Sequence, residues 1–94
     1  MNQINATIKW LTEQEGGRRE IPIGFRYCPI IKIKGYEKTD VAWSIDFICA
    51  NHHYNISRIN FAFLSNDAPE DILISGKEFE LYEGTRKVAY GTID

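Results

Sequence analysis

Two short segments of the chain combine glycine with arginine or lysine, a pairing that can bind an anion. The polar stretch from Glu13 to Glu20 contains two glycines followed by two arginines, and Glu83 to Lys87 repeats the theme with one glycine and two cations. Glycine lets backbone N–H groups turn outward, and arginine holds a carboxylate or phosphate with two hydrogen bonds. If the fold brings both segments to one end, we expect a mixed binding patch near Arg26. The candidate binding residues are Gly16, Gly17, Arg18, Arg19, Arg26, Gly84, Arg86 and Lys87.

The other residues of types found in catalytic or metal sites are not arranged for catalysis or for metal binding. Glu78 and Glu80 stand two positions apart on the strand face opposite Phe79, which is typical of a solvated outer face rather than of a general acid–base pair. His52 and His53 are adjacent, so their side chains diverge, whereas a metal site needs three or four convergent ligands. The sequence also lacks the glycine-rich phosphate loops of nucleotide-binding enzymes. We therefore expect no enzyme activity, no metal ion, no cofactor and no GTP binding.

A run of lysines around one tyrosine offers a second possible contact surface. Lys32, Lys34, Tyr36 and Lys38 resemble the basic and aromatic interleaving of proteins that bind single-stranded nucleic acid. Lysines on an edge strand also repel the edges of other sheets, and we favour this second interpretation.

The bulk composition bounds the class of protein. The chain has 94 residues, the length of one small domain spanning 1–94, and its 44% hydrophobic and 26% charged content is that of a globular protein. A net charge of −2 gives no overall attraction to phosphate or to anionic lipid. The N-terminus lacks the features of a signal peptide, and no apolar run is long enough to span a membrane. We therefore expect a soluble cytoplasmic protein with no membrane partner, in which Cys28 and Cys49 are reduced and buried.

The elements that must position these residues are strands, because the hydrophobic period is two. Alternating side chains predict strands over 4–10, 27–34, 41–49 and 59–64, followed by two more around Phe79 to Leu81 and Val88 to Tyr90. Trp43, Phe61 and Phe79 are expected to face the core. Pro69 could begin a single helical turn. Six antiparallel strands in so short a chain would expose edges unless the sheet closes, so the sequence predicts a small barrel or sandwich.

Both glycine–arginine segments also carry a family resemblance. The segment from Ile8 to Arg18, followed by Gly24-Phe25-Arg26, resembles the start of the C-terminal (third) β-barrel domain of elongation factor Tu. That domain opens with a strand, a Glu-Gly-Gly-Arg loop and a Gly-Tyr-Arg-Pro element. The segment from Gly76 to Ile93 resembles its last hairpin, with a Glu-Gly turn followed by an arginine. The chain departs from the family at Arg19-Glu20, where His-Thr is usual, and at Tyr27, where proline is usual.

The resemblance implies an all-β, six-stranded antiparallel barrel and a role in binding. In the family these loops face aminoacyl-tRNA and neighbouring domains, and the glycines and arginines at Gly16, Gly17, Arg18, Arg26, Gly84 and Arg86 occupy the matching positions. We expect a stand-alone, non-enzymatic module that binds a protein, as an inhibitor of the immunity-protein kind or in place of the factor's own domain. The alternative is a module that binds tRNA or another RNA.

Overall fold

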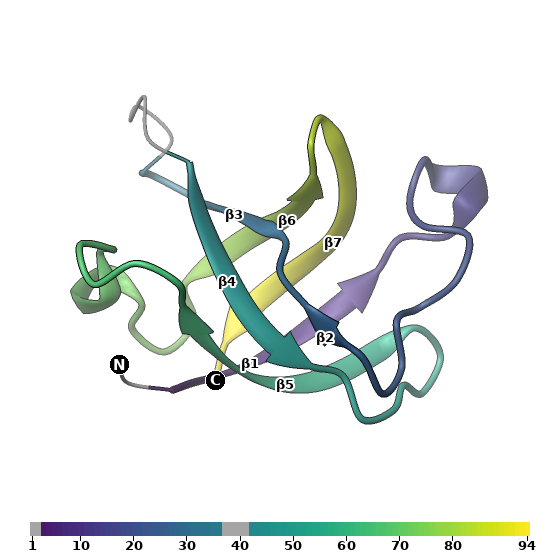
Figure 1. Cartoon of the computed structure of the whole chain (residues 1–94), viewed down its shortest axis with the longest axis horizontal. Coiled ribbons are helices and arrows are strands. Elements are labelled where there is room, and N and C mark those ends of the chain that lie inside the picture. Colours follow the sequence, from purple (N-terminus) through teal and green to yellow (C-terminus); the bar gives the residue numbers. More distant parts are fainter. Residues whose placement is uncertain (1–2, 37–41) are drawn as a thin grey trace.

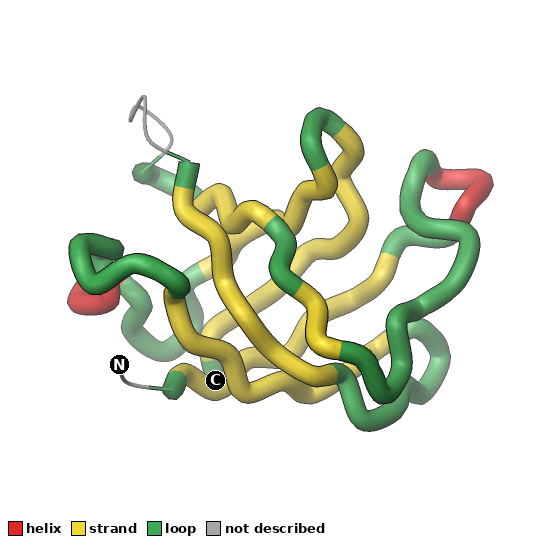
Figure 2. Tube along the Cα trace, in the orientation of Figure 1, coloured by secondary structure: helices red, strands yellow, loops and turns green. Residues whose placement is uncertain are grey.

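A computed structural model describes residues 3–36 and 42–94, and strands make up nearly all of its regular structure (Figures 1 and 2). The strands are β1 (Ile4–Trp10), β2 (Arg26–Tyr27), β3 (Ile30–Ile33), β4 (Trp43–Ile48), β5 (Ile56–Phe63), β6 (Glu78–Glu83) and β7 (Arg86–Ile93). Two 3₁₀ turns, η1 (Glu13–Glu15) and η2 (Glu70–Ile72), are the helical elements of the described residues. The predicted helical turn after Pro69 is therefore present as η2. No helix in 3–36 or 42–94 has the length and apolarity to cross a lipid bilayer.

The strands close into a six-stranded antiparallel β-barrel, which confirms the predicted fold class. Hydrogen-bonded neighbours follow the order β4-β3-β6-β7-β1-β5, and a further pairing of β5 with β4 completes the ring. The short β2 and β3 act as two parts of one interrupted strand, because both pair with β4. The interruption falls at Cys28 and Pro29, where proline has no N–H to give to the sheet. Closure leaves the barrel without long free edges.

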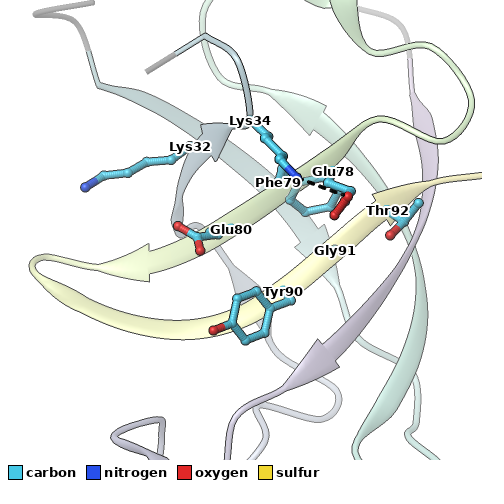
Figure 3. A pocket seen from close by; sticks show the side chains of 8 residues that line it. All are labelled: Lys32, Lys34, Glu78, Phe79, Glu80, Tyr90, Gly91 and Thr92. Carbon is cyan, nitrogen blue, oxygen red and sulfur yellow. Dashed lines mark ion pairs between the residues drawn. The ribbon is translucent and has the colours of Figure 1, made fainter. Parts of the chain in front are cut away.

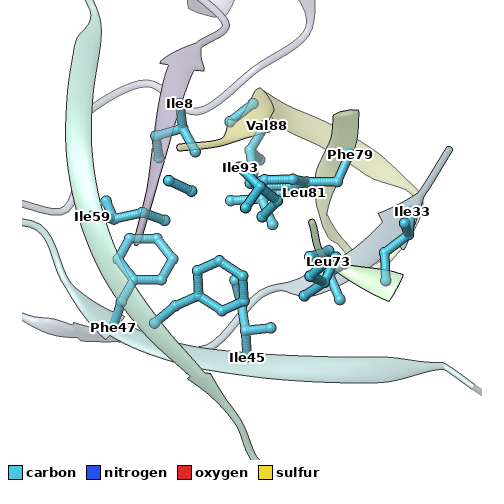
Figure 4. Packing of buried hydrophobic residues seen from close by; sticks show 14 of the residues in the cluster. Ile8, Ile33, Ile45, Phe47, Ile59, Leu73, Phe79, Leu81, Val88 and Ile93 are labelled. Carbon is cyan, nitrogen blue, oxygen red and sulfur yellow. The ribbon is translucent and has the colours of Figure 1, made fainter. Parts of the chain in front are cut away.

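The core fills the inside of this ring with alternate side chains of the strands (Figure 4). The buried apolar residues are Ala6, Ile8, Trp10, Ile31, Ile33, Ile45, Phe47, Cys49, Ile59, Phe61, Phe63, Leu73, Phe79, Leu81, Val88, Ala89 and Ile93. Phe61 and Phe79 face the core as predicted, whereas Trp43 is only partly buried and packs at its margin. Val41 and Lys38 lie outside the described residues.

A β-bulge corrects the predicted facing of the last strand. The pairing of β6 with β7 shifts register after Leu81, so Val88 and Ala89 are both buried although they are neighbours. An extra residue in one strand reverses the side-chain alternation beyond it. Tyr90, which an unbroken alternation from Val88 would place inside the barrel, therefore lies on the outer surface.

The cysteines also differ from expectation. Both are free thiols, and Cys49 is buried as predicted. Cys28 is exposed, so the expectation of burial was wrong for this residue. The reason is alternation around β2: Tyr27 turns toward the core, and the next side chain consequently turns away from it.

The antiparallel order places three connections at one end of the barrel, which we call the loop end. These are residues 11–25 between β1 and β2, residues 49–55 between β4 and β5, and the turn at 84–85 between β6 and β7. Figure 1 shows residues 11–25 at the right, the 49–55 connection at the lower right and the β6–β7 turn at the top, all away from both termini. Both glycine–arginine segments therefore lie at the same end of the molecule.

Candidate functional site

An ion pair joins the two glycine–arginine segments at the loop end. Arg18 Nη1 contacts Glu83 Oε2, and the same carboxylate oxygen accepts a hydrogen bond from the Tyr27 hydroxyl. Arg18 Nε also donates to the carbonyl oxygen of Glu20 at 2.9 Å, which holds the segment after the glycines in place. The side chains of Arg18 and Glu83 are about two-thirds covered. The two segments are therefore one structure rather than two independent loops.

The Arg18–Glu83 pair rests on aromatic side chains that close this end of the barrel. The Arg18 guanidinium lies 5.2 Å from the centre of the Tyr27 ring, a cation–π distance. The Tyr27 ring in turn packs against Trp10 and Phe47, with ring centres 5.7 and 5.6 Å apart. Since Trp10 and Phe47 belong to the core, the core fixes the position of the charged groups above it.

The charge state of this cluster follows from its contacts. Burial by itself would raise the pKa of the Glu83 carboxyl, but the hydrogen bonds from Tyr27 and Arg18 outweigh it and lower that pKa below its ordinary value. Burial and the hydrogen bond to Glu83 raise the pKa of the Tyr27 hydroxyl. At neutral pH the carboxylate is therefore ionised and Tyr27 remains a hydrogen-bond donor.

An open depression of about 410 Å³ lies beside the ion pair. It is lined by Arg18, Arg19, Glu20, Glu83 and Arg86. Three guanidinium groups against two carboxylates give these five residues a net charge of +1. Within the described part of the chain, no ion pair or side-chain hydrogen bond engages Arg19 or Arg86, which are exposed. These two arginines are thus free to bind an anionic group.

The glycines shape the loops rather than offering their amides to a ligand. Gly16 has a left-handed φ of 91° at the end of η1, and its N–H donates to Glu13 O. The Gly17 N–H donates to Thr12 O at 2.8 Å, and a Cβ at this position would lie 2.3 Å from Leu11 O. The expectation that these N–H groups turn outward was therefore wrong for both residues. Gly84, with φ of 60°, forms the tight turn between β6 and β7.

Like the three glycines, two of the predicted cationic residues do not line the depression. Arg26 Nε bonds Asp46 Oδ1 at 2.8 Å on the outer face of β4. Lys87 Nζ lies 2.8 Å from Glu80 Oε2 and 4.8 Å from the centre of the Tyr90 ring. Both residues neighbour members of the cluster in sequence, and strand alternation directs their side chains to the opposite face.

The sequence-based prediction missed three contributors to this site. Thr12 and Glu15 form a capping box at η1, in which each side chain accepts a hydrogen bond from the other residue's backbone N–H. The Thr-x-x-Glu spacing is a signal that could have revealed it. No such signal marks Tyr27, because its role at the site is a hydrogen bond to Glu83, which lies 56 positions away in the sequence. Glu83 was not among the candidate binding residues, whereas in the fold its carboxylate holds Arg18 and Tyr27 together.

A second depression, of about 480 Å³, lies on the outer face of β3, β6 and β7 (Figure 3). Three of its four charged lining residues are in ion pairs: Lys34 lies 3.6 Å from Glu78, and Glu80 lies 2.8 Å from Lys87. The fourth, Lys32, lies with its Nζ 4.1 Å from the centre of the Tyr82 ring, and the four lining charges sum to zero. Glu78 and Glu80 face outward, opposite Phe79, as predicted. Internal pairing leaves this surface less able to attract a charged ligand than the loop end. In the described ranges, no group of three His, Cys, Asp or Glu residues is arranged to hold a metal ion.

The chain matches no model of a known protein family, and a search of curated proteins finds no match either.

Proposed function

We propose that this domain is a non-enzymatic, protein-binding module whose contact surface is the loop end. The observation that carries the proposal is the Arg18–Glu83–Tyr27 cluster, which fixes the two loops and leaves Arg19 and Arg86 unpaired beside a depression. The ion pair fixes the loops that carry Arg19 and Arg86, so binding a carboxylate would have to order the two side chains but not the loops. The expected ligand group is an aspartate, a glutamate or a terminal carboxylate of another protein.

A protein partner fits this surface better than RNA does. Affinity for RNA depends on neutralising many phosphates, and the cluster has a net charge of only +1 because Glu20 and Glu83 lie within it. The proposed relation to the third domain of elongation factor Tu favours tRNA as the second candidate. Glu20, however, places a carboxylate where that family has a hydroxyl. Protein interfaces tolerate mixed charge and are enriched in arginine.

The test is a selection of random displayed peptides on the immobilised protein, with the Arg19→Ala/Arg86→Ala double variant as counter-target. We expect peptides enriched in Asp and Glu, and we expect the synthetic form of the best one to lose at least about tenfold in affinity on the double variant. Both arginines are exposed, so the double variant should keep the melting temperature of the wild type.

Bulk tRNA is the comparator probe in the same assay. If the protein binds tRNA more tightly than the selected peptide, and if that affinity falls steeply with salt, the RNA-binding candidate replaces the protein-binding one. Selection of peptides without acidic residues, or equal binding to the counter-target, would contradict the proposed use of the arginines.

A further inference from the structure

The connection between β4 and β5 presents an aromatic side chain in a strained conformation. Tyr54 and Asn55 both have positive φ, of 52° and 64°, which is the geometry of a tight hairpin turn. Asparagine tolerates this region, but a bulky residue there costs free energy that glycine would avoid. The Tyr54 side chain is nevertheless 84% exposed. Its ring lies edge-on to the exposed ring of His53, with centres 4.4 Å apart, and within residues 3–36 and 42–94 it does not join the core cluster. Strain of this kind concentrates at binding surfaces.

This connection is held firmly by the core beneath it. The Trp10 backbone N–H donates to Asn55 O at 2.7 Å. Inside the barrel the Trp10 indole N–H donates to the buried Ser57 hydroxyl, which donates to Asn51 O at 2.8 Å. Tyr54 is therefore presented on an ordered turn, so binding would not have to order the loop.

Further exposed apolar side chains lie on the neighbouring connection of the loop end. Ile23 bridges to Cys49, and the Gly24 N–H donates to Cys49 O at 2.9 Å, so residues 23–25 run beside the end of β4. Phe25 is 71% exposed, and Ile48 at the end of β4 is 62% exposed. Figure 1 shows the two connections side by side at the lower right. We call Ile23, Phe25 and Tyr54 the apolar rim; Ile48 is not included, because it pairs with Arg26 and shares the outer face of β4 with that residue.

The apolar rim belongs to the same barrel end as Arg19 and Arg86. Phe25 is two residues from Tyr27, whose hydroxyl bonds Glu83 in the charged cluster. Large aromatic side chains beside arginine are the residues that contribute most binding energy in protein interfaces. The combination fits one kind of partner, a protein segment with apolar side chains next to acidic ones.

Charge argues against the two other possible occupants. A symmetric dimer through this end would place the patch against its own copy, and two surfaces that each carry a net charge of +1 repel one another. An anionic lipid surface attracts clusters of several cations, whereas the arginines here are interspersed with Glu20 and Glu83.

We propose that the apolar rim and the unpaired arginines form one continuous docking surface for an acidic, apolar-containing segment of another protein. This inference rests on the proposed function, which assigns the carboxylates of the partner to the two arginines. It adds that the partner also carries apolar side chains, which pack against Tyr54 and Phe25.

The test measures the affinity of the selected synthetic peptide for Tyr54→Gly and for Phe25→Ser. Glycine adopts the φ of position 54 freely, so Tyr54→Gly should melt at the same or a higher temperature and still bind at least about tenfold more weakly. A structural role for Tyr54 would give the opposite thermal result. The matched control is Ile74→Ser, because Ile74 is 67% exposed in the connection between β5 and β6 at the opposite end. This control should bind as the wild type does.

Four outcomes would overturn the inference. If Arg19→Ala/Arg86→Ala weakens binding while both rim variants bind normally, the rim is not part of the surface and the proposed function survives. If the wild type forms dimers that Tyr54→Gly dissociates, the occupant is a second copy. If phosphatidylserine vesicles bind the wild type and not Phe25→Ser, the occupant is a lipid surface. Wild-type affinity in the arginine and rim variants alike would overturn the proposed function as well.

Discussion

Arg18 and Glu83 form an ion pair across 65 residues of sequence, and this contact makes one surface of two loops. The carboxylate of Glu83 also accepts a hydrogen bond from the hydroxyl of Tyr27, and the Tyr27 ring packs on the aromatic core. The chain of contacts therefore runs from the core to the surface charges. Changes at Glu83 should consequently alter both stability and the placement of the arginines.

Replacing Glu83 by Gln should lower the free energy of unfolding by about 1–2 kcal/mol near neutral pH, because the charge-assisted bonds to Arg18 and Tyr27 are weakened at a partly exposed site. The lowered pKa of folded Glu83 also fixes the pH dependence. The contribution of the Glu83 carboxylate to the free energy of unfolding is complete above the pKa of 4.5 that the group has in the unfolded chain. It is lost as the pH falls through the lower pKa of the folded state. Urea denaturation of both proteins over this range should show the difference shrinking toward zero in acid. A difference that stays constant with pH would mean that Glu83 does not act through its charge.

The two adjacent glycines should respond to alanine for different reasons. Gly17→Ala places a Cβ against the Leu11 backbone and should cost about 2–3 kcal/mol, because backbone cannot move as a side chain can. Gly16→Ala has open space and suffers only the left-handed conformation, at about 1–2 kcal/mol. Thermal unfolding of both variants measures the order. A more severe effect at Gly16 would contradict the packing described for this loop.

The ring of Phe79 occupies the space that a side chain at Gly91 would need. A Cβ at Gly91 would lie 2.1 Å from Phe79 Cζ, on the cross-strand pair that these residues form. Gly91→Ala should therefore destabilise by at least about 2 kcal/mol, and the smaller side chain in Phe79→Leu should recover part of that loss in the double variant. Chemical denaturation of the two single variants and the double variant gives the coupling. Strictly additive effects would show that the ring and the glycine do not pack together.

Two of the three aromatic residues predicted to face the core, Phe61 and Trp43, should differ in the free energy lost on truncation to alanine. Phe61 is fully buried, so Phe61→Ala should lose about 3–5 kcal/mol. Trp43 is only partly buried, and its indole N–H is shielded from solvent but has no hydrogen-bond partner among residues 3–36 and 42–94, so Trp43→Ala should lose less. The two free energies of unfolding, measured in urea, provide the comparison. An equal or larger loss at Trp43 would place it in the core after all.

The alternation of apolar and polar residues in the sequence was sufficient to predict most of the barrel, because each strand has one buried and one solvent-exposed face. Val88 and Tyr90 show its limit: a bulge reverses the alternation, and no residue type marks its position. The sequence could predict that Arg18 and Arg86 lie in one patch only if the fold brings both loops to the same end. That condition depends on the order of the strands in the barrel, which the sequence pattern does not specify. Tyr54 shows a further limit, because a tyrosine with positive φ looks like any polar-loop residue in the sequence.

The most direct measurement of the central claim is an amide chemical-shift map of the ¹⁵N-labelled protein titrated with the selected peptide. If the loop end is the binding surface, the largest shifts fall on residues 18–20 and 84–86, with further shifts at 23–25 and 54, and those at Lys34, Glu78 and Ile74 stay small. Shifts concentrated on the outer face of β3 and β6, or on the end that carries the termini, would contradict the account.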